Sequence, residues 1–427
     1  MYRIRDKYKH LLNFSANVAT LFFEGVTFAY IWYTYYSATI PVPFYRRGNW
    51  AVVGMYSFMV FLITRAMNGY KIGYLRLIDI WLSHILSVVL SAVVGYVLIT
   101  MINRVYIDPR PLGGMALLQI VFIVPWVFIV RKLYAWLYPP HRTLVVYGDH
   151  SPELLLEKMN VHRERYNICK TVSCHENEDK LHEEILRYGA VVLADLPAEE
   201  RNIILKFCYQ NGIRVYVTPK VTDILLASSD DVHLFDTPLL LVRSYGFNIT
   251  ELFFKRIFDV IISLVFIVIL SPFMLLVAVA IKLCDGGPVL YKQDRLTRDG
   301  KEFMILKFRS MYMDSEKKGG ARLAAEKDDR ITPVGRIIRR IHFDEVPQLF
   351  NIIAGDMSFV GPRPERREIQ DKYKEIIPEF DFRLKVKAGL TGYAQVYGKY
   401  NTTPYDKLKM DLTYIQNYSP LLDIKII

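Results

Sequence analysis

Thr332-Pro-Val-Gly-Arg336 opens the stretch of sequence that says most about this chain, and Arg339-Arg340 and Asp344-Glu345-Val-Pro-Gln348 follow it closely. The stretch ends with Ser358-Phe-Val-Gly-Pro-Arg363-Pro-Glu365. It sets an acidic pair between two groups of arginines, a composition suited to holding a metal against a diphosphate while a carboxylate attacks it. The chain contains six adjacent acidic pairs, and most such pairs are solvated surface. The order of arginines and acidic residues along this stretch therefore indicates a function, and the acidic pair alone does not.

The residues after the acidic pair predict the start of a helix. In Asp344-Glu345-Val346-Pro347, the proline falls within the first turn, where its missing N–H is not needed, and Asp344 falls at or near the N-cap. The dipole and free amides of a helix start favour an ionised carboxylate and an approaching phosphate. Spacing alone leaves a plainer interpretation open, in which Asp344 only caps the helix and Glu345 is an ordinary first-turn acid.

Basic side chains near this stretch are candidates for binding substrate phosphates, because guanidinium and ammonium groups match phosphate oxygens. The candidates are Arg336, Arg339 and Arg340 at helical spacing, Arg363 between two prolines, and Lys307 and Arg309, which alternate on a strand predicted over 303–310. A basic surface facing a membrane is an alternative use for the arginines, compatible with the first. Asp314 is a further acidic candidate, and 315–329 is predicted to form a mobile loop or loose helix over the site.

The composition places part of the chain in a membrane. A chain of 427 residues has room for about two or three domains. Hydrophobic residues make up 52% of it, too many for a wholly soluble protein of this size. The net charge of +11 would suit nucleic acid or an anionic leaflet equally well. Because the chain has no finger, RNP or homeodomain-like pattern, we expect a lipid bilayer and anionic substrates as partners, and no nucleic acid.

Four apolar runs are long enough to cross a bilayer, at 11–40, 50–63, 77–101 and 115–138, the second being the shortest. Lysine and arginine predict their orientation. Ten of these residues lie at one end of the predicted bundle: Arg3, Arg5, Lys7, Lys9, Arg65, Lys71, Arg76, Arg131, Lys132 and Arg142. Only Arg46, Arg47, Arg104 and Arg110 lie at the other end. The excess predicts a four-helix transmembrane bundle over residues 1–140 with both of its ends in the cytoplasm.

A small α/β domain is predicted over 141–248. Short β-rich runs at 143–147, 190–194 and 213–217 indicate buried parallel strands, and 152–159, 179–188 and 199–210 indicate crossover helices. This order predicts a Rossmann-like cytoplasmic domain. The turn after the first strand is Gly148-Asp-His-Ser151, which is not the dinucleotide-binding pattern. We therefore expect a structural, dimerising or regulatory role, with a homodimer as one assembly, in preference to nucleotide binding.

The four cysteines, Cys169, Cys174, Cys208 and Cys284, contain no C-x-x-C pair. Cys169 and Cys174 are close enough to share a zinc ion, but the histidines that follow, His175 and His182, do not have zinc-finger spacing. The expectation is therefore four buried, reduced thiols.

Seven short motifs follow one another from Lys255 onward: Lys255-Arg-Ile-Phe-Asp259, Ser271-Pro272, Tyr291-Lys-Gln293 with Arg295, Lys307-Phe-Arg-Ser-Met311, Asp344-Glu345, Gly361-Pro-Arg-Pro-Glu365, and Gly389-Leu-Thr-Gly392 with Gln395. Together they resemble the catalytic domain of the bacterial sugar transferases. These are monotopic phosphoglycosyl transferases that move a sugar phosphate from a nucleotide-diphosphate sugar to a polyprenyl phosphate. With several spans and a middle domain ahead of it, the chain resembles the large, polysaccharide-initiating subclass.

The resemblance implies roles for particular residues. It implies Asp344 as the nucleophile that forms a covalent phosphosugar intermediate, and Glu345 as its partner, with both carboxylates supporting Mg²⁺. It also implies a UDP-sugar and undecaprenyl phosphate as substrates, a nucleoside monophosphate as product, and a location at the cytoplasmic face of the bacterial inner membrane. The catalytic domain would be a monotopic α/β unit over 249–427.

The segment 260–281 is long enough for a fifth span, but parity argues against one. Four spans leave the middle domain in the cytoplasm, and a fifth crossing would separate the catalytic unit from its nucleotide sugar. A re-entrant helix over 257–283 is therefore predicted, broken at Ser271-Pro272, where the proline cannot donate to the Val268 carbonyl and the serine can substitute for it. Lys255, Arg256 and Lys282 would then all lie at the headgroups. An ordinary span with a proline kink is the alternative.

The chain departs from the family pattern in places. Ile341-His342-Phe343 replaces the usual lead into the acidic pair, and Ala388 and Ala394 stand where many members have proline and tryptophan. These changes leave the sugar open. Members usually continue past the point where this chain stops, so a final amphipathic element is expected to be absent. The alternative function is a non-enzymatic membrane scaffold or regulator of polysaccharide export; a transporter conflicts with the charged, globular character of 284–427.

Overall fold

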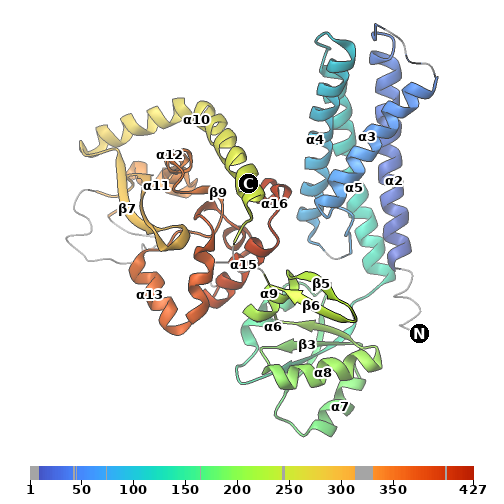
Figure 1. Cartoon of the computed structure of the whole chain (residues 1–427), viewed down its shortest axis with the longest axis vertical. Helices are drawn as coiled ribbons and strands as arrows, with labels where there is room; N and C mark the ends of the chain where they lie inside the picture. The colour runs from blue at the N-terminus through green and yellow to red at the C-terminus, as the bar shows by residue number, and fades with distance from the viewer. Residues whose placement is uncertain are drawn as a thin grey trace. The chain divides into compact units, whose positions relative to one another are not determined.

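The computed structural model describes residues 9–41, 44, 46–73, 75–163, 165–242, 246–312, 330–399 and 402–427. The chain divides into two compact units, Met1–Thr218 and Pro219–Ile427 (Figure 1). The first unit contains a group of long helices and a small α/β domain, and the second contains the acidic pair. Asp314 and the loop expected over 315–329 lie outside the described residues.

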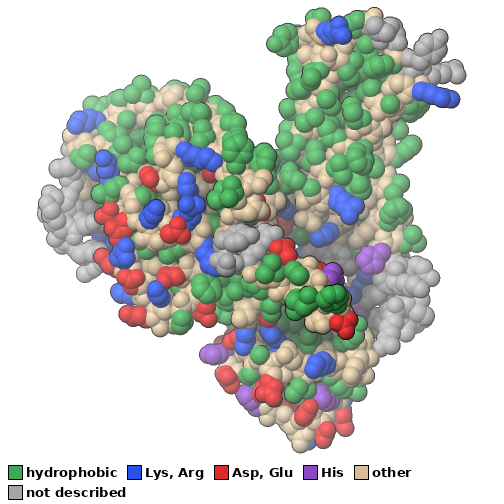
Figure 2. All heavy atoms as spheres, viewed as in Figure 1, with side chains coloured by type: hydrophobic (Ala, Val, Ile, Leu, Met, Phe, Trp, Pro, Cys, Tyr) green, Lys and Arg blue, Asp and Glu red, His purple; other side chains and the backbone are tan. Residues whose placement is uncertain are grey.

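Long helices form the first part of unit one: α2 (Lys9–Ile31) with the π-helical turn η1 (Trp32–Tyr36), α3 (Arg46–Ala66), α4 (Leu77–Asn103) and α5 (Arg110–Leu137). Helices α2 and α4 each pack against both α3 and α5. All four helices are long and apolar enough to cross a membrane, as the four apolar runs predict. Their outward faces carry hydrophobic side chains (Figure 2), which indicates a membrane protein.

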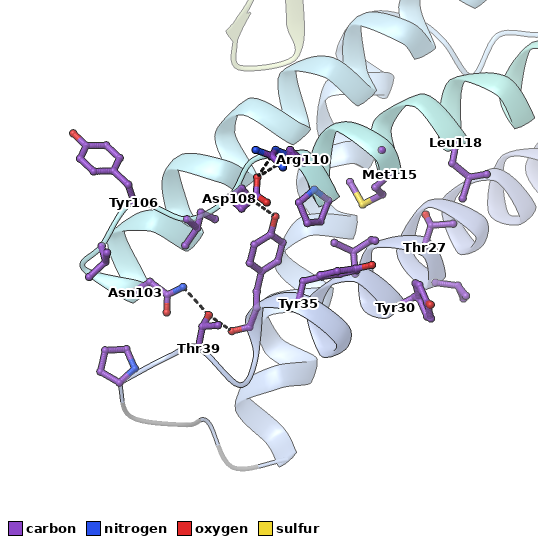
Figure 3. A pocket seen from close by; sticks show the side chains of 18 residues that line it. Thr27, Tyr30, Tyr35, Thr39, Asn103, Tyr106, Asp108, Arg110, Met115 and Leu118 are labelled. Carbon is purple, nitrogen blue, oxygen red and sulfur yellow. Dashed lines mark hydrogen bonds and ion pairs between the residues drawn. The ribbon is translucent and has the colours of Figure 1, made fainter.

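A cavity of about 1170 Å³ lies among α2, η1, α5 and the loop that joins α4 to α5 (Figure 3). Its walls are mainly apolar and aromatic, and some of their polar groups pair with one another. The Tyr36 hydroxyl donates to the Asp108 carbonyl at 2.7 Å, and the Asn103 amide donates to Thr39 Oγ1 at 3.1 Å. Among the residues that line this cavity, none belongs to the site predicted from sequence.

The α/β domain is built on four parallel strands in the order β2-β1-β3-β4. The strands are β1 (Arg142–Tyr147), β2 (Asn167–Ser173), β3 (Ala190–Ala194) and β4 (Arg214–Val217), joined by helices α6 (Glu153–Asn160), α7 (Glu178–Leu186) and α8 (Ala198–Asn211). The three predicted strands and the three predicted helices are confirmed. Strand β2 was not predicted, because it lies at the sheet edge with only Val172 buried, and so lacks an apolar pattern.

The second unit contains many short elements around one long helix. They are α9 (Val221–Ala227), β5 (Asp230–Leu234), β6 (Thr237–Leu241), α10 (Ile249–Asp285), β7 (Leu290–Leu296), η2 (Arg298–Gly300), β8 (Glu302–Phe308), α11 (Pro333–Arg340), η3 (Phe343–Glu345), α12 (Gln348–Ala354), β9 (Ser358–Val360), α13 (Arg367–Ile376), η4 (Pro378–Lys385), β10 (Gly389–Thr391), α14 (Tyr393–Tyr397), α15 (Pro404–Gln416) and α16 (Pro420–Ile426). Strands β7 and β8 form an antiparallel hairpin, as do β5 and β6, and β9 pairs with β10 in parallel.

Helix α9 packs with this second unit, although its residues fall within the α/β domain predicted over 141–248. It contacts α15, Val221 and Ile224 join the hydrophobic core of the unit, and Ser228 Oγ lies 2.9 Å from Gln416 Oε1. The compact unit therefore begins at Pro219, whereas the expected division into folding domains at residue 248 stays a prediction.

The motifs around residues 361 and 389 require glycine at these two positions. A Cβ atom on Gly361 would lie 2.5 Å from the Lys387 carbonyl oxygen, and one on Gly389 would lie 2.1 Å from the Gly361 nitrogen. Backbone atoms cannot yield as a flexible side chain can, so any larger residue would force the β9 and β10 segments apart. Their close approach fixes the start of the segment that carries Arg363.

Helix α10 is a continuous helix of 37 residues that contains Pro272, and it changes direction along its length (Figure 1). Pro272 cannot donate to the Val268 carbonyl, and Ser271 Oγ donates to that carbonyl instead at 2.9 Å. This substitution is the one that the sequence predicts. Most of the helix exposes apolar side chains, and it is the fifth helix long and apolar enough to cross a membrane.

The first turns of α10 attach it to the rest of the unit through three charged side chains. Lys255 Nζ donates to Asp423 Oδ2 at 2.7 Å and to the Tyr414 hydroxyl at 3.0 Å. Arg256 donates to two carbonyls at the end of α12, at 2.6 and 2.7 Å, and Asp259 Oδ1 accepts from the Phe359 N–H at 2.9 Å. Protein groups therefore bind the Lys255 and Arg256 side chains, whereas Lys282 is exposed; the expectation that all three lie at lipid headgroups stays a prediction.

Lys255→Met should lower the free energy of unfolding of the second unit by about 3–5 kcal/mol, because it leaves the buried Asp423 carboxylate without its cation. The double variant Lys255→Met with Asp423→Leu should recover much of that loss, since it removes both charges. Denaturant unfolding in detergent would measure both, with exposed Lys282→Met as the matched control. A double variant no more stable than Lys255→Met would contradict the role assigned to this pair.

Candidate active site

The acidic pair lies in η3, a short 3₁₀ turn between α11 and α12. His342 precedes the turn in the left-handed conformation (φ 55°) and reverses the chain after α11; histidine is among the residues that adopt this conformation more readily than most. Helix α12 begins at Gln348, with Pro347 at its N-cap. The predicted helix start at Asp344 is thus wrong by about one turn, because the 3₁₀ turn takes up the residues before the proline.

Glu345 is held by two cations from distant parts of the chain. Lys307 Nζ of β8 donates to Glu345 Oε1 at 2.7 Å, and Arg363 Nη2 donates to the same oxygen at 3.0 Å. Arg363 follows β9, and its carbonyl accepts from Arg383 Nη2 at 3.0 Å. Arg383 is itself buried against Asp411 at 2.8 Å. Two of the predicted phosphate-binding residues therefore meet at the predicted dyad.

Asp344 has a different environment from its neighbour. Across the described residues, no other side chain donates a hydrogen bond to its carboxylate, and the nearest positive charges come from Lys307 and Arg339. Burial raises the pKa of Asp344, and the negative charge of Glu345 raises this pKa further, although Lys307 and Arg339 oppose both effects. The sequence-based expectation was that a helix start favours the ionised form of Asp344. Burial instead dominates, so the net pKa of this carboxylate is raised.

The pKa of Glu345 shifts in the opposite direction. Burial acts to raise it, but Arg363 and Lys307 outweigh burial and hold the pKa of Glu345 below its ordinary value. Two adjacent carboxylates thus acquire different properties from their surroundings. Glu345 is a fixed, charge-compensated anion, whereas Asp344 is a more basic carboxylate without a hydrogen bond from another described side chain.

The other predicted phosphate-binding residues are not all brought to the dyad. Arg339 is half-buried on α11, contributes its charge to Asp344, and has a buried Nη1 without a hydrogen-bond partner. Arg336 and Arg340 are exposed on the same helix. Arg309 lies just past the end of β8; its side chain is buried and its N–H donates to the Val289 carbonyl. Its side chain is more buried than that of Lys307, and its predicted contact with phosphate stays a prediction.

Sequence reasoning did not assign a role to three residues that line the small pocket beside Glu345: Arg295, Gln348 and Leu390. Arg295 of β7 donates to the Pro364 carbonyl at 3.2 Å and to Gln293 Oε1 at 2.7 Å. The motif Tyr291-Lys-Gln293 with Arg295 could have indicated a role for Arg295, because alternate residues of a strand share a face. Which partners those residues meet depends on the fold.

The opposite pKa shifts predict opposite stability effects at neutral pH. Ionised Asp344 costs folding free energy, and this cost grows as pH rises from about 4, the unfolded value, through the raised folded pKa. Glu345 stabilises above about pH 4 and loses that effect as pH falls through its lowered folded pKa. Asp344→Asn should therefore raise Tm and Glu345→Gln should lower it at pH 7, with both differences shrinking in acid.

Thermal unfolding in detergent across pH would measure these differences. The exposed Asp371→Asn is the matched control and should change Tm little. A destabilised Asp344→Asn at neutral pH would show that burial does not dominate the electrostatics of this carboxylate.

Comparison with known proteins matches these features to one family. The family model for "Bacterial sugar transferase" matches residues 250–427. A UDP-N-acetylgalactosamine-undecaprenyl-phosphate N-acetylgalactosaminephosphotransferase of Aeromonas hydrophila is 38% identical over 249 residues, 57% of this chain and 58% of that protein. A UDP-glucose:undecaprenyl-phosphate glucose-1-phosphate transferase of Escherichia coli (strain K12) is 37% identical over 202 residues, 46% of this chain and 41% of that protein.

The chain thus spans only about half the length of these two transferases. A shorter relative is covered almost completely: the exopolysaccharide production protein PSS of Rhizobium leguminosarum bv. phaseoli is 39% identical over 185 residues, which is 42% of this chain and 92% of that protein. The family-model match, residues 250–427, includes the dyad, both cations that bind Glu345 and nearly all of α10. The chain therefore belongs to the bacterial sugar transferase family.

Proposed function

We propose that this chain transfers a sugar-1-phosphate from a UDP-sugar to undecaprenyl phosphate and releases the nucleoside monophosphate. The observation that carries this proposal is the difference between the two adjacent carboxylates. Glu345 is bound by Lys307 and Arg363, whereas no other described side chain donates a hydrogen bond to the Asp344 carboxylate. The names of the Aeromonas and Escherichia relatives describe this type of transfer and support it.

Asp344 is the proposed nucleophile. One of its oxygens attacks the β-phosphorus of the nucleotide sugar, and the bond from that phosphorus to the bridging oxygen breaks, with its electron pair leaving on the nucleoside monophosphate. The aspartyl-phosphosugar intermediate then meets a phosphate oxygen of undecaprenyl phosphate. This oxygen displaces the Asp344 carboxylate and yields a lipid-diphosphate sugar. A raised pKa suits this role, because a more basic carboxylate is the stronger nucleophile once ionised.

The cations around the dyad stabilise charge on the transferred phosphate. Lys307 and Arg363 neutralise Glu345, so the substrate does not meet two uncompensated carboxylates. Arg363 is about half exposed, and its remaining N–H groups can bind phosphate oxygens. Arg339 adds its positive charge near Asp344, and its buried Nη1 has no hydrogen-bond partner among the described residues. Positioning and electrostatics of this kind account for most catalysis of phosphoryl transfer.

The two carboxylates also fit a magnesium ion. Mg²⁺ binds through one or two carboxylates together with substrate phosphates. Asp344 offers oxygens that no other described side chain occupies, and Glu345 lies next to it. Asp344 and Glu345 would hold the ion. When bound, Mg²⁺ would supply positive charge against the diphosphate.

The proposed membrane arrangement follows from the apolar helices. Helices α2 to α5 cross the bacterial inner membrane as a four-helix bundle, and the Rossmann-like domain and the catalytic unit lie on the cytoplasmic face. Helix α10 enters that face and returns to it, since it changes direction along its length and contains Pro272, which breaks the hydrogen-bond pattern of a helix. Both halves of α10 pack on elements of the catalytic unit, which would keep the dyad close to the lipid substrate.

Asp344→Asn should lower turnover by several orders of magnitude while the fold survives, because it removes the nucleophile and keeps its shape. Purified protein would be assayed with a panel of nucleotide sugars, undecaprenyl phosphate and Mg²⁺. Nucleoside monophosphate release would identify both the reaction and the sugar. The exposed Asp371→Asn should retain wild-type turnover. Near-normal turnover of Asp344→Asn would contradict the covalent mechanism.

The products separate this function from its alternatives. We expect ping-pong kinetics, and protein-bound sugar phosphate after acid quenching without lipid acceptor. Stoichiometric nucleoside diphosphate would mean sugar-only transfer. No turnover with any sugar, in wild-type protein that remains folded, would favour a non-enzymatic scaffold.

Cysteine labelling tests the re-entrant path of α10. In a background without the four native cysteines, Ile249→Cys and Lys292→Cys should both resist an impermeant reagent in intact cells and react after lysis. Both native side chains are exposed in the structure. Tyr106→Cys, in the exposed loop between α4 and α5, is the control that should react in intact cells. Labelling of position 292 from outside would show that α10 is a true span.

A further inference from the structure

A cluster of metal-binding side chain types lies in the α/β domain, outside the proposed active site. Asp149 follows β1, Cys174 and His175 follow β2, and Glu200 lies in the first turn of α8, which follows β3. All of these positions come after the carboxyl ends of parallel strands, the edge at which open α/β sheets bind their ligands. Zinc-finger spacing is absent from the sequence, but the fold assembles a different set of ligands from separate loops.

The ligand atoms of three of these residues are already close together. The Cys174 sulfur, a ring nitrogen of His175 and a carboxylate oxygen of Glu200 all lie within 4.8 Å of one another. His175 Nδ1 lies 3.9 Å from Glu200 Oε1. Zinc–sulfur and zinc–nitrogen bonds are about 2.3 and 2.0 Å long, so two ligand atoms on one zinc ion lie less than about 4 Å apart. Small side-chain rotations would bring the three ligand atoms from within 4.8 Å to that separation.

The other nitrogen of His175 is also placed as a metal ligand requires. His175 Nε2 lies 2.9 Å from Asp149 Oδ1, so the imidazole is oriented with Nδ1 toward Glu200. A metal-bound histidine typically donates its second N–H to such an outer carboxylate, which fixes the tautomer and makes the ligating nitrogen more basic. This contact is independent of the clustering of the three ligand atoms.

We propose that Cys174 Sγ, His175 Nδ1 and the Glu200 carboxylate bind a zinc-class divalent cation, with Asp149 orienting His175. A thiolate and an imidazole select zinc or a similar transition metal over Mg²⁺ and Ca²⁺, which prefer oxygen ligands. Three protein ligands leave a fourth position for water or a small anion.

The surroundings of Cys174 support this assignment. Its N–H donates to the Tyr147 carbonyl at 2.9 Å, which fixes the turn after β2, and its side chain is buried. Glu200 Oε2 is buried with no hydrogen-bond partner among the described residues.

The remaining cysteines differ in burial and provide controls. The structure has Cys208 buried, Cys284 half-buried and Cys169 exposed on β2, all as free thiols. The expectation of four buried thiols is thus wrong for Cys169, because its edge strand faces solvent. Cys169 lies in the same domain as Cys174 but outside the cluster, which makes Cys169→Ser the matched control.

Cobalt titration of the full-length, tag-free protein tests the proposal directly. After removal of bound metal in detergent, Co²⁺ should produce a thiolate-to-cobalt charge-transfer band at a stoichiometry of one, and Zn²⁺ should abolish the band by displacing cobalt. Cys174→Ser should remove the band, His175→Gln should weaken binding, and Asp149→Asn should lower affinity about 10–100-fold. Cys169→Ser should behave as wild type.

A second measurement does not depend on a variant that folds. In the wild-type protein, Zn²⁺ should slow alkylation of Cys174, followed by mass spectrometry, and leave alkylation of Cys169 unchanged. Absence of a thiolate band in the wild type, a band that persists in Cys174→Ser, or an alkylation rate of Cys174 unchanged by Zn²⁺ would overturn the proposal. None of these outcomes depends on transferase activity.

Discussion

The buried pair of Lys255 and Asp423, 2.7 Å apart, is the interaction on which the arrangement of the catalytic unit most depends. A charge can be buried at acceptable cost only when it is paired and hydrogen-bonded. Lys255 meets this condition through Asp423 and Tyr414, and the next turn of α10 adds Arg256 and Asp259. These contacts join the most apolar helix of the unit to α12, β9, α15 and α16, and α12 begins just after the acidic pair.

The second half of α10 reaches the same site from another direction. Ile281 packs in a small core with Phe308 and Ile338, and Phe343, the residue before Asp344, packs against that core. One bent helix thus contacts the elements on both sides of the dyad and leaves most of its own apolar surface exposed. Because α10 changes direction along its length, its two halves can contact both α12 and α11.

At the dyad, charge placement gives two neighbouring carboxylates different roles. Arg363 reaches Glu345 because β9 and β10 approach so closely that only glycine fits at 361 and 389, and because Arg383 holds the Arg363 carbonyl. Lys307 reaches the same oxygen from β8. Asp344 receives no comparable hydrogen bond from another described side chain. A fixed anion beside a more basic carboxylate is a useful pair for covalent phosphoryl transfer.

The sequence alone predicts the four apolar helices, most of the parallel sheet and the family motifs, and it indicates Asp344, Glu345, Lys307 and Arg363 as candidate site residues. These features depend on local periodicity or on ordered motifs, which sequence preserves. Three features became visible only in the folded chain: which arginine contacts Glu345, the binding of Lys255 and Arg256 by protein groups, and the start of α12 after the acidic pair. The tertiary structure alone brought Cys174, His175 and Glu200 together. Such contacts join residues far apart in the chain, and burial, charge and backbone geometry at those contacts exist only once the chain has folded.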